Sequence, residues 1–156
     1  MDESAVIDSI LRESRTIAVV GLSDKPDRPS YRVAKYLQTH GYRIVPVNPA
    51  LTEVLGERSY PDLAAVPGPV DVVDIFRRPE DVPPIVEAAI ARGAKAVWMQ
   101  EGIVNEPAAE RARSAGLQVV MNLCMKKEHE KRRPGAGAGN RQDDSPAAPA
   151  GGVGQP

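Results

Sequence analysis

Residues 16–40 read TIAVVGLSDKPDRPSYRVAKYLQTH, and this stretch decides the fold. Its first five residues are mostly apolar and β-branched, as expected for a strand that is covered on both faces of a parallel sheet. Gly21 then permits a tight turn. The following residues 30–40 carry Val33, Ala34 and Leu37 at helical spacing. A strand, a loop and a helix in this order are typical of an α/β protein.

The same alternation continues along the chain. Four more short apolar runs predict strands at residues 43–47, 70–76, 96–99 and 117–121, and helical patterns lie at residues 2–13, 79–92 and 105–115. Gly41, Gly93 and Gly116 follow three of the predicted helices, where glycine accepts the left-handed conformation at low cost. Ser30 and Asn105 suit helix N-caps. The pattern predicts a Rossmann-like, three-layer α/β domain with a parallel sheet of about five strands.

Composition limits the possible functions. The 156 residues are 42% hydrophobic and carry a net charge of −1, which argues against a generally basic nucleic-acid binder. No stretch approaches the roughly 20 apolar residues of a membrane helix, and the acidic start does not resemble a secretory signal. One cysteine and two histidines do not form a spaced metal set. We therefore expect a cytoplasmic protein without a metal, membrane or nucleic-acid partner.

The composition changes at Pro134. From there to the end, 15 of 23 residues are Gly, Pro or Ala, and Val153 is the only larger aliphatic residue. Such a segment buries too little apolar surface to offset its ordering entropy. We expect a folded domain over residues 1–133 and a disordered tail over residues 134–156.

The loop after the first strand is a candidate phosphate site. Ligands of open parallel sheets bind beyond the carboxyl ends of the strands. Gly21 permits close backbone approach, Ser23 and Ser30 supply hydroxyls, and the following helix supplies free amides. Lys25 and Arg28 add positive charge. The alternative is an ordinary charged turn, because only the first glycine of the dinucleotide-binding fingerprint is present.

The second strand ends in Val47-Asn48-Pro49. NAD-binding relatives of the fold carry an acid here, which binds the ribose hydroxyls. A neutral Asn48 instead permits a ribose phosphate nearby, and the flanking prolines offer a rigid apolar surface to a purine ring. A rigid turn without a ligand is the alternative.

The next strand ends in Phe76 and Arg77, with Arg78 following. Guanidinium groups bind phosphate oxygens in a bidentate manner. The alternatives are that the arginines pair with Glu80 or Asp81, and that Phe76 belongs to the core.

Gln100 and Gly102 follow the fourth strand and are further candidates for ligand contact. Trp98 fits the core better than a ligand platform. Glu101 is a possible base, but the sequence places no nucleophile beside it. Cys124, after the last strand, fits a small buried apolar residue better than a reactive thiol. His40 and His129 are expected to be solvated.

Taken together, these loops resemble a known family of small, stand-alone CoA-binding proteins. Their Rossmann domain is similar to the amino-terminal CoA-binding domain of the succinyl-CoA synthetase α subunit. The resemblance spans about residues 7–130. It is carried by Val20-Gly21-Leu22-Ser23 with Arg28-Pro29-Ser30-Tyr31, Pro46-Val47-Asn48-Pro49 with Leu55-Gly56, Val72–Pro79, Val97-Trp98-Met99-Gln100 with Gly102, and Gly116-Leu117 with Val119-Val120-Met121 and Cys124.

The resemblance implies CoA as the ligand, with nucleotide phosphates and adenine at the first two loops and the pantetheine arm between the third and fourth. The synthetase also uses a second domain with a phosphorylated histidine and a partner subunit, for which this chain has no room. We therefore expect a CoA or acyl-CoA binding protein that is not catalytic on its own. The alternatives are an NAD(P)-dependent oxidoreductase or redox sensor, a CoA-site component of a multi-subunit acyl-CoA ligase, and thiol redox chemistry between Cys124 and CoA disulfide. A protein partner is not identified by the sequence.

Overall fold

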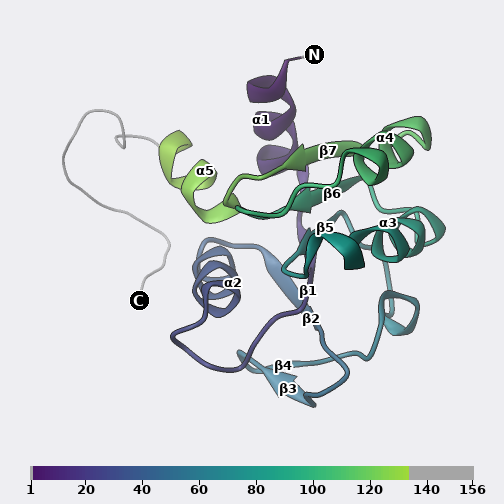
Figure 1. Ribbon diagram of the computed structural model, residues 1–156. Coiled ribbons are helices and arrows are strands. Elements are labelled where there is room, and N and C mark those ends of the chain that lie inside the picture. The colour runs from purple at the N-terminus through teal and green to yellow at the C-terminus, as the bar shows by residue number, and fades with distance from the viewer. Residues whose placement is uncertain (1, 134–156) are drawn as a thin grey trace.

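The computed structural model describes residues 2–133, and a five-stranded parallel sheet forms its centre (Figure 1). Met1 and the predicted tail at residues 134–156 lie outside the described residues. The strand order is β2-β1-β5-β6-β7, and all neighbours are parallel. The strands are β1 (Thr16–Val20), β2 (Arg43–Val47), β5 (Val72–Ile75), β6 (Ala96–Met99) and β7 (Gln118–Met121). The predicted Rossmann-like α/β class is confirmed.

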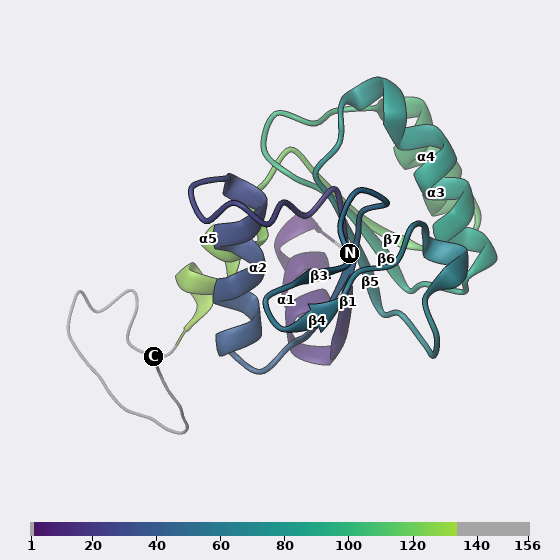
Figure 2. The same ribbon diagram turned by 90° about the horizontal axis from the view of Figure 1, so that it is seen from below.

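Helices cover both faces of the sheet, which makes three layers (Figures 1 and 2). One face carries α1 (Glu3–Glu13), α2 (Pro29–Thr39) and α5 (Met125–Arg132), and the other carries α3 (Val82–Ala91) and α4 (Glu106–Ser114). The chain leaves β1, forms α2 and β2 on one side, and then crosses to β5 on the other side of β1. This reversal places the switch point of the sheet between β1 and β5.

Each face has its own hydrophobic cluster, because side chains of a strand alternate between faces. On the α3/α4 face, Val73, Ile75 and Val97 are fully buried against the alanines of α4 and the valines of α3. On the other face, Ile17, Val19 and Trp98 pack beneath α1, α2 and α5. Burial of each large aliphatic side chain contributes roughly 1.5–3 kcal/mol.

One residue of the sheet departs from this apolar pattern. Asp74, in β5, is fully buried, and neither carboxylate oxygen has a hydrogen-bond partner among the described residues. It lies level with Val19 of β1 and Trp98 of β6. Burial raises the pKa of this carboxyl well above its ordinary value.

Several local predictions need correction. Ser30 does not cap α2: the helix begins at Pro29, which suits a first helical turn, and Arg28 is the N-cap residue. Asn105 does cap α4, and its side chain accepts a hydrogen bond from the Ala108 amide at 3.0 Å. The predicted helix at residues 79–92 is divided into the 3₁₀ turn η2 (Pro79–Asp81) and α3.

Two short features had no sequence prediction. The strands β3 (Glu53–Val54) and β4 (Glu57–Arg58) form a hairpin after β2, and the 3₁₀ turn η1 (Leu63–Ala65) precedes β5. None of the helices between residues 2 and 133 is long and apolar enough to span a bilayer.

Candidate ligand-binding site

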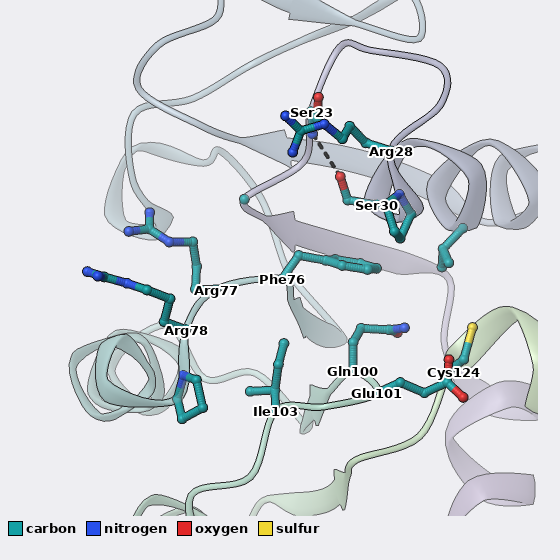
Figure 3. A pocket seen from close by; sticks show the side chains of 14 residues that line it. Ser23, Arg28, Ser30, Phe76, Arg77, Arg78, Gln100, Glu101, Ile103 and Cys124 are labelled. Carbon is teal, nitrogen blue, oxygen red and sulfur yellow. Dashed lines mark hydrogen bonds between the residues drawn. The ribbon is translucent and has the colours of Figure 1, made fainter.

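A cavity of about 700 Å³ opens at the carboxyl ends of β1, β5 and β6, beside the switch point of the sheet (Figure 3). This volume is within the usual range for small-molecule sites. The lining comes from the loop after β1, the first turn of α2, the loops after β5 and β6, and the residue before α5. Its members are Gly21, Ser23, Arg28, Pro29, Ser30, Val33, Phe76, Arg77, Arg78, Pro79, Gln100, Glu101, Ile103 and Cys124.

Gly21 allows two of these loops to meet. Its φ is +89°, a left-handed conformation that favours glycine. A Cβ atom at this position would lie within 2.4 Å of the Phe76 carbonyl oxygen and 3.0 Å of Arg77 Cδ. The Gly21 amide also donates to the Val47 carbonyl at 2.9 Å. The first loop therefore lies directly against the end of β5, which brings the phosphate-site candidates beside the arginines.

The first loop is organised by its own hydroxyls. The Ser23 amide donates to Ser30 Oγ at 3.0 Å, and the Lys25 amide donates to Ser23 Oγ at 3.0 Å. These bonds hold the loop over the beginning of α2. The Ser30 and Tyr31 amides, in the first turn of α2, have no hydrogen-bond partner among the described residues. A helix N-terminus with unpaired amides favours an anion.

Three guanidinium groups border the cavity, and they differ in their pairing. Arg77 and Arg78 both contact Asp81, at 3.1 and 3.2 Å, as one of the alternatives anticipated. The hydrogen bond from Arg78 and the neighbouring Arg77 hold the pKa of Asp81 below its usual value. Arg28 has no ion-pair partner within residues 2–133 and is exposed. Exposed ion pairs contribute only about 0–1 kcal/mol, so an incoming phosphate can compete for Arg77 and Arg78.

The far end of the cavity is less charged. Gln100 is 3% exposed, and its Oε1 accepts a hydrogen bond from the Met125 amide at 3.2 Å. Cys124 is buried as expected, yet it contributes to the lining. Half-buried Phe76 lies between this end and the arginines (Figure 3). Glu101, at the rim, is paired with Lys127 at 3.1 Å.

Seven of the twelve residues that the sequence nominated line the cavity: Gly21, Ser23, Arg28, Ser30, Phe76, Arg77 and Gln100. The other five, Lys25, Val47, Asn48, Pro49 and Gly102, lie outside its lining. Lys25 and Pro49 are exposed on the surface, and Val47 is buried in β2. The exposed Gly102 donates its amide to Asn122 Oδ1 at 2.7 Å.

Asn48 has a structural role at the end of β2. Its Nδ2 donates to the Leu22 carbonyl at 3.0 Å, and its Oδ1 accepts from the Ala50 amide at 2.9 Å. Both ends of the amide are therefore occupied by backbone groups. This side chain ties the first loop to the second, and the end of β2 offers no carboxylate to a ribose.

Of the other seven lining residues, the sequence suggested possible roles for Arg78, Glu101 and Cys124, but it did not single out Pro29, Val33, Pro79 or Ile103. Pro29 directly precedes Ser30, and Val33 lies one turn further along the same face of α2, so helical spacing from Ser30 could have found Val33. Cys124 follows the carboxyl end of β7, a placement that also signals proximity to the site. Pro79 and Ile103 have no distinguishing pattern in the sequence.

The two histidines lie away from this cavity. His40 is exposed, as predicted, but the prediction of a solvated His129 is wrong. His129 is half-buried between α2 and α5, and its Nδ1 is 2.8 Å from the Tyr36 hydroxyl. Burial and, to a smaller extent, the nearby His40 lower the pKa of His129 to about 4. Among the described residues, no group of three or more His, Cys, Asp or Glu side chains is placed to hold a metal ion.

Comparison with known proteins places this fold and site in context. Protein YneT of Bacillus subtilis (strain 168) is 45% identical over 125 residues, which cover 80% of this chain and 93% of YneT. A hypothetical protein from Pyrococcus horikoshii OT3 is 44% identical with a TM-score of 0.80, over 83% of this chain and 92% of that chain.

A larger protein matches over part of its length. The dinucleotide-forming acetyl-coenzyme A synthetase 1 of Ca. Korarchaeum cryptofilum is 27% identical with a TM-score of 0.63, and the match covers 71% of this chain but 26% of the synthetase. The family model described as a CoA binding domain matches residues 15–130, which include every residue of the cavity lining. The chain therefore belongs to the CoA-binding domain family.

Proposed function

We propose that the protein binds CoA or an acyl-CoA in this cavity and is not catalytic on its own. The observation that carries the proposal is the distribution of charge around the cavity. Arg28, Arg77 and Arg78 line the cavity, and the unpaired amides of α2 follow Arg28 directly in the chain. CoA carries a pyrophosphate and a 3′-phosphate, which are the groups that guanidiniums and helix N-termini bind.

The end of β2 supports CoA over NAD. A ribose without a phosphate is usually bound by an acid at this position. Asn48 replaces that acid, and both ends of its amide are occupied by the backbone. The membership of the CoA-binding domain family also supports the proposal. The single free cysteine is compatible with a reducing compartment, and we extend the proposal to a cytoplasmic location.

The experiment is calorimetric titration of the full chain with CoA, dephospho-CoA, NAD and NADP under reducing conditions. We expect CoA to bind and dephospho-CoA to bind about tenfold more weakly, which corresponds to about 1.4 kcal/mol for the 3′-phosphate. Preferential binding of NAD or NADP would overturn the proposal in favour of hydride chemistry.

Arg28→Ala is the informative variant, because Arg28 borders the cavity and has no ion-pair partner within the described chain. We expect it to weaken CoA binding by about tenfold. Lys35→Ala is the matched control, since Lys35 is an exposed cation on the outer side of α2. It removes the same charge and should leave CoA affinity within about twofold.

A second candidate function is a CoA site supplied to a separate ligase. It is favoured by the partial match to the acetyl-coenzyme A synthetase, of which this chain covers 26%. Incubation of the chain with acetate, ATP and CoA tests it. The first proposal predicts no acetyl-CoA, whereas product formed only after a partner protein is added would support the second.

A further inference from the structure

Cys124 and Gln100 lie on the side of the cavity away from Arg77 and Arg78 (Figure 3). Cys124 is the only cysteine of the chain. Gln100 is more than nine-tenths buried, and its Oε1 is occupied by the Met125 amide. Its amide nitrogen has no partner among the described residues, and the side chain extends into the cavity toward Cys124. A donor of a buried side chain that is left free on the cavity side can bind a polar ligand group beside the thiol.

Cys124 lies directly before α5 and lines the cavity. Cys124 is the N-cap residue of α5, its carbonyl accepts the Glu128 amide at 2.9 Å, and its side chain makes no capping bond. Cys124 therefore lies at the positive end of the helix dipole. Lys126 and Lys127 follow in the first turn, where they pair with Glu130 and Glu101 at 3.0 and 3.1 Å. A helix N-terminus is one of the positions at which proteins hold reactive cysteines.

The shape of the proposed ligand connects the two ends of the cavity. CoA has its phosphates at one end and a thiol at the end of a flexible arm. If the phosphates lie against the arginines, the arm extends past Phe76, its amides reach Gln100, and its sulfur arrives at Cys124. Resting on the proposed CoA binding, we propose that Cys124 is a thiol–disulfide exchange site that forms a mixed disulfide with CoA.

The step is an exchange in which the electrons balance. The Cys124 thiolate attacks one sulfur of CoA disulfide, the S–S bond between the two CoA moieties breaks, and a bond forms between Cys124 Sγ and the attacked sulfur. The second CoA leaves as a thiolate, which takes up the proton that Cys124 released. The disulfide supplies the oxidising equivalents, so no other oxidant is required. A free thiol reverses the reaction in the same way.

The test is intact-mass spectrometry of the full chain after incubation with CoA disulfide. We expect the addition of one CoA per chain, complete removal by dithiothreitol, and no addition to Cys124→Ser. Bis(2-hydroxyethyl) disulfide, which has no phosphate, provides the comparison. It should label the protein at least about tenfold more slowly, because nothing directs it into the cavity.

Arg28→Ala shows whether the thiol is reached through the phosphate end. It should slow labelling by CoA disulfide about tenfold, in proportion to the weaker binding, with no such change for the hydroxyethyl disulfide. Lys35→Ala should change neither rate. Reversible CoA binding in the calorimeter without any adduct would overturn this inference and leave the proposed function intact, as would equal labelling by the two disulfides. Absence of CoA binding would overturn both.

Discussion

The two faces of the sheet share five strands but differ in what they bury. Beneath α3 and α4, the cluster consists of aliphatic side chains from the strands and both helices. The other face also buries polar groups, which are Ser30 of α2, Asp74 of β5, Gln100 after β6 and Glu128 of α5. The cavity also draws on this second face, through α2, Gln100 and the residue before α5. The comparison indicates that one face mainly supplies stability and the other combines stability with ligand recognition.

Ile75→Ala offers the severest test of this difference. Ile75 is fully buried on the α3/α4 face, and its truncation leaves a cavity among side chains that are already close-packed. We expect a loss of about 3 kcal/mol in the free energy of unfolding, measured by urea denaturation. A loss below about 1 kcal/mol would show that this face is packed too loosely to be the main source of stability.

Gly21→Ala probes the contact between the first loop and β5. The new Cβ meets the Phe76 carbonyl oxygen in a backbone conformation that favours glycine. We expect a loss of about 2 kcal/mol in stability together with weaker CoA binding. Gly68→Ala is the matched control, because Gly68 has a φ of +78° and no atom within 4 Å of the added Cβ. Equal losses of stability in the two variants would mean that the left-handed backbone conformation causes the loss at Gly21, and that the contact of the added Cβ with Phe76 contributes little.

Asp74 is the neighbour of Ile75 in β5, and we expect its replacement to act in the opposite direction. Asp74→Val removes a buried polar group without a partner and should stabilise the protein by about 1–3 kcal/mol at pH 7. Burial raises the pKa of Asp74 above its ordinary value of 3.8, so the folded state holds its proton more tightly than the unfolded state. The wild-type protein should therefore lose stability as the pH rises from about 4 through the folded-state pKa.

Denaturation of wild type, Asp74→Val and Asp74→Asn across this pH range separates the two effects. Both variants should lack the decrease with pH, but Asp74→Asn retains a buried polar side chain and should gain less stability. If the free energy of unfolding of the wild type changes with pH in the same way as that of the two variants, the raised pKa of Asp74 in the folded state is contradicted.

His129→Phe should have the smallest effect at pH 7, within about 1 kcal/mol, because an aromatic ring is retained and a single hydrogen bond to Tyr36 is lost. The lowered pKa of about 4 means that the unfolded state binds the proton more readily. Stability from His129 is therefore present above its ordinary pKa of 6.5 and decreases as the pH falls from there toward 4. The free energy of unfolding of the variant should therefore change less between pH 6.5 and 4 than that of the wild type. An unchanged acid unfolding transition would show that groups other than His129 control this transition.

The sequence was sufficient for the sheet and for most of the helices, because each depends on local periodicity. The runs at residues 16–20, 43–47 and 96–99 coincide with β1, β2 and β6. The β3–β4 hairpin was missed because each strand has two residues, too few for an alternating pattern. His129 was misplaced because its burial depends on the packing of α5 against α2, residues that are far apart in the chain.

The candidate site could be predicted only in part for a similar reason. Strand ends identified the loops that meet, and these loops supplied Gly21, Arg77 and Gln100. The spacing did not show that the side-chain amide of Asn48 would form hydrogen bonds with the backbone of Leu22 and Ala50. Membership of a loop indicates which edge of the sheet a residue occupies, but the direction of its side chain depends on hydrogen bonds that form only in the folded protein.

Trp98 has a consequence of a different kind, which is spectroscopic. It is the only tryptophan of the chain, it is fully buried level with Asp74, and its indole nitrogen donates to the Leu123 carbonyl at 2.8 Å. The tryptophan fluorescence of the natural protein therefore comes from one known position. This position lies two residues before Gln100 and is hydrogen-bonded to Leu123, the residue before Cys124. Its emission wavelength will follow unfolding of the sheet, and its intensity will respond to any movement of the segment leading into α5, so occupancy and stability can be recorded in one cuvette without an added dye.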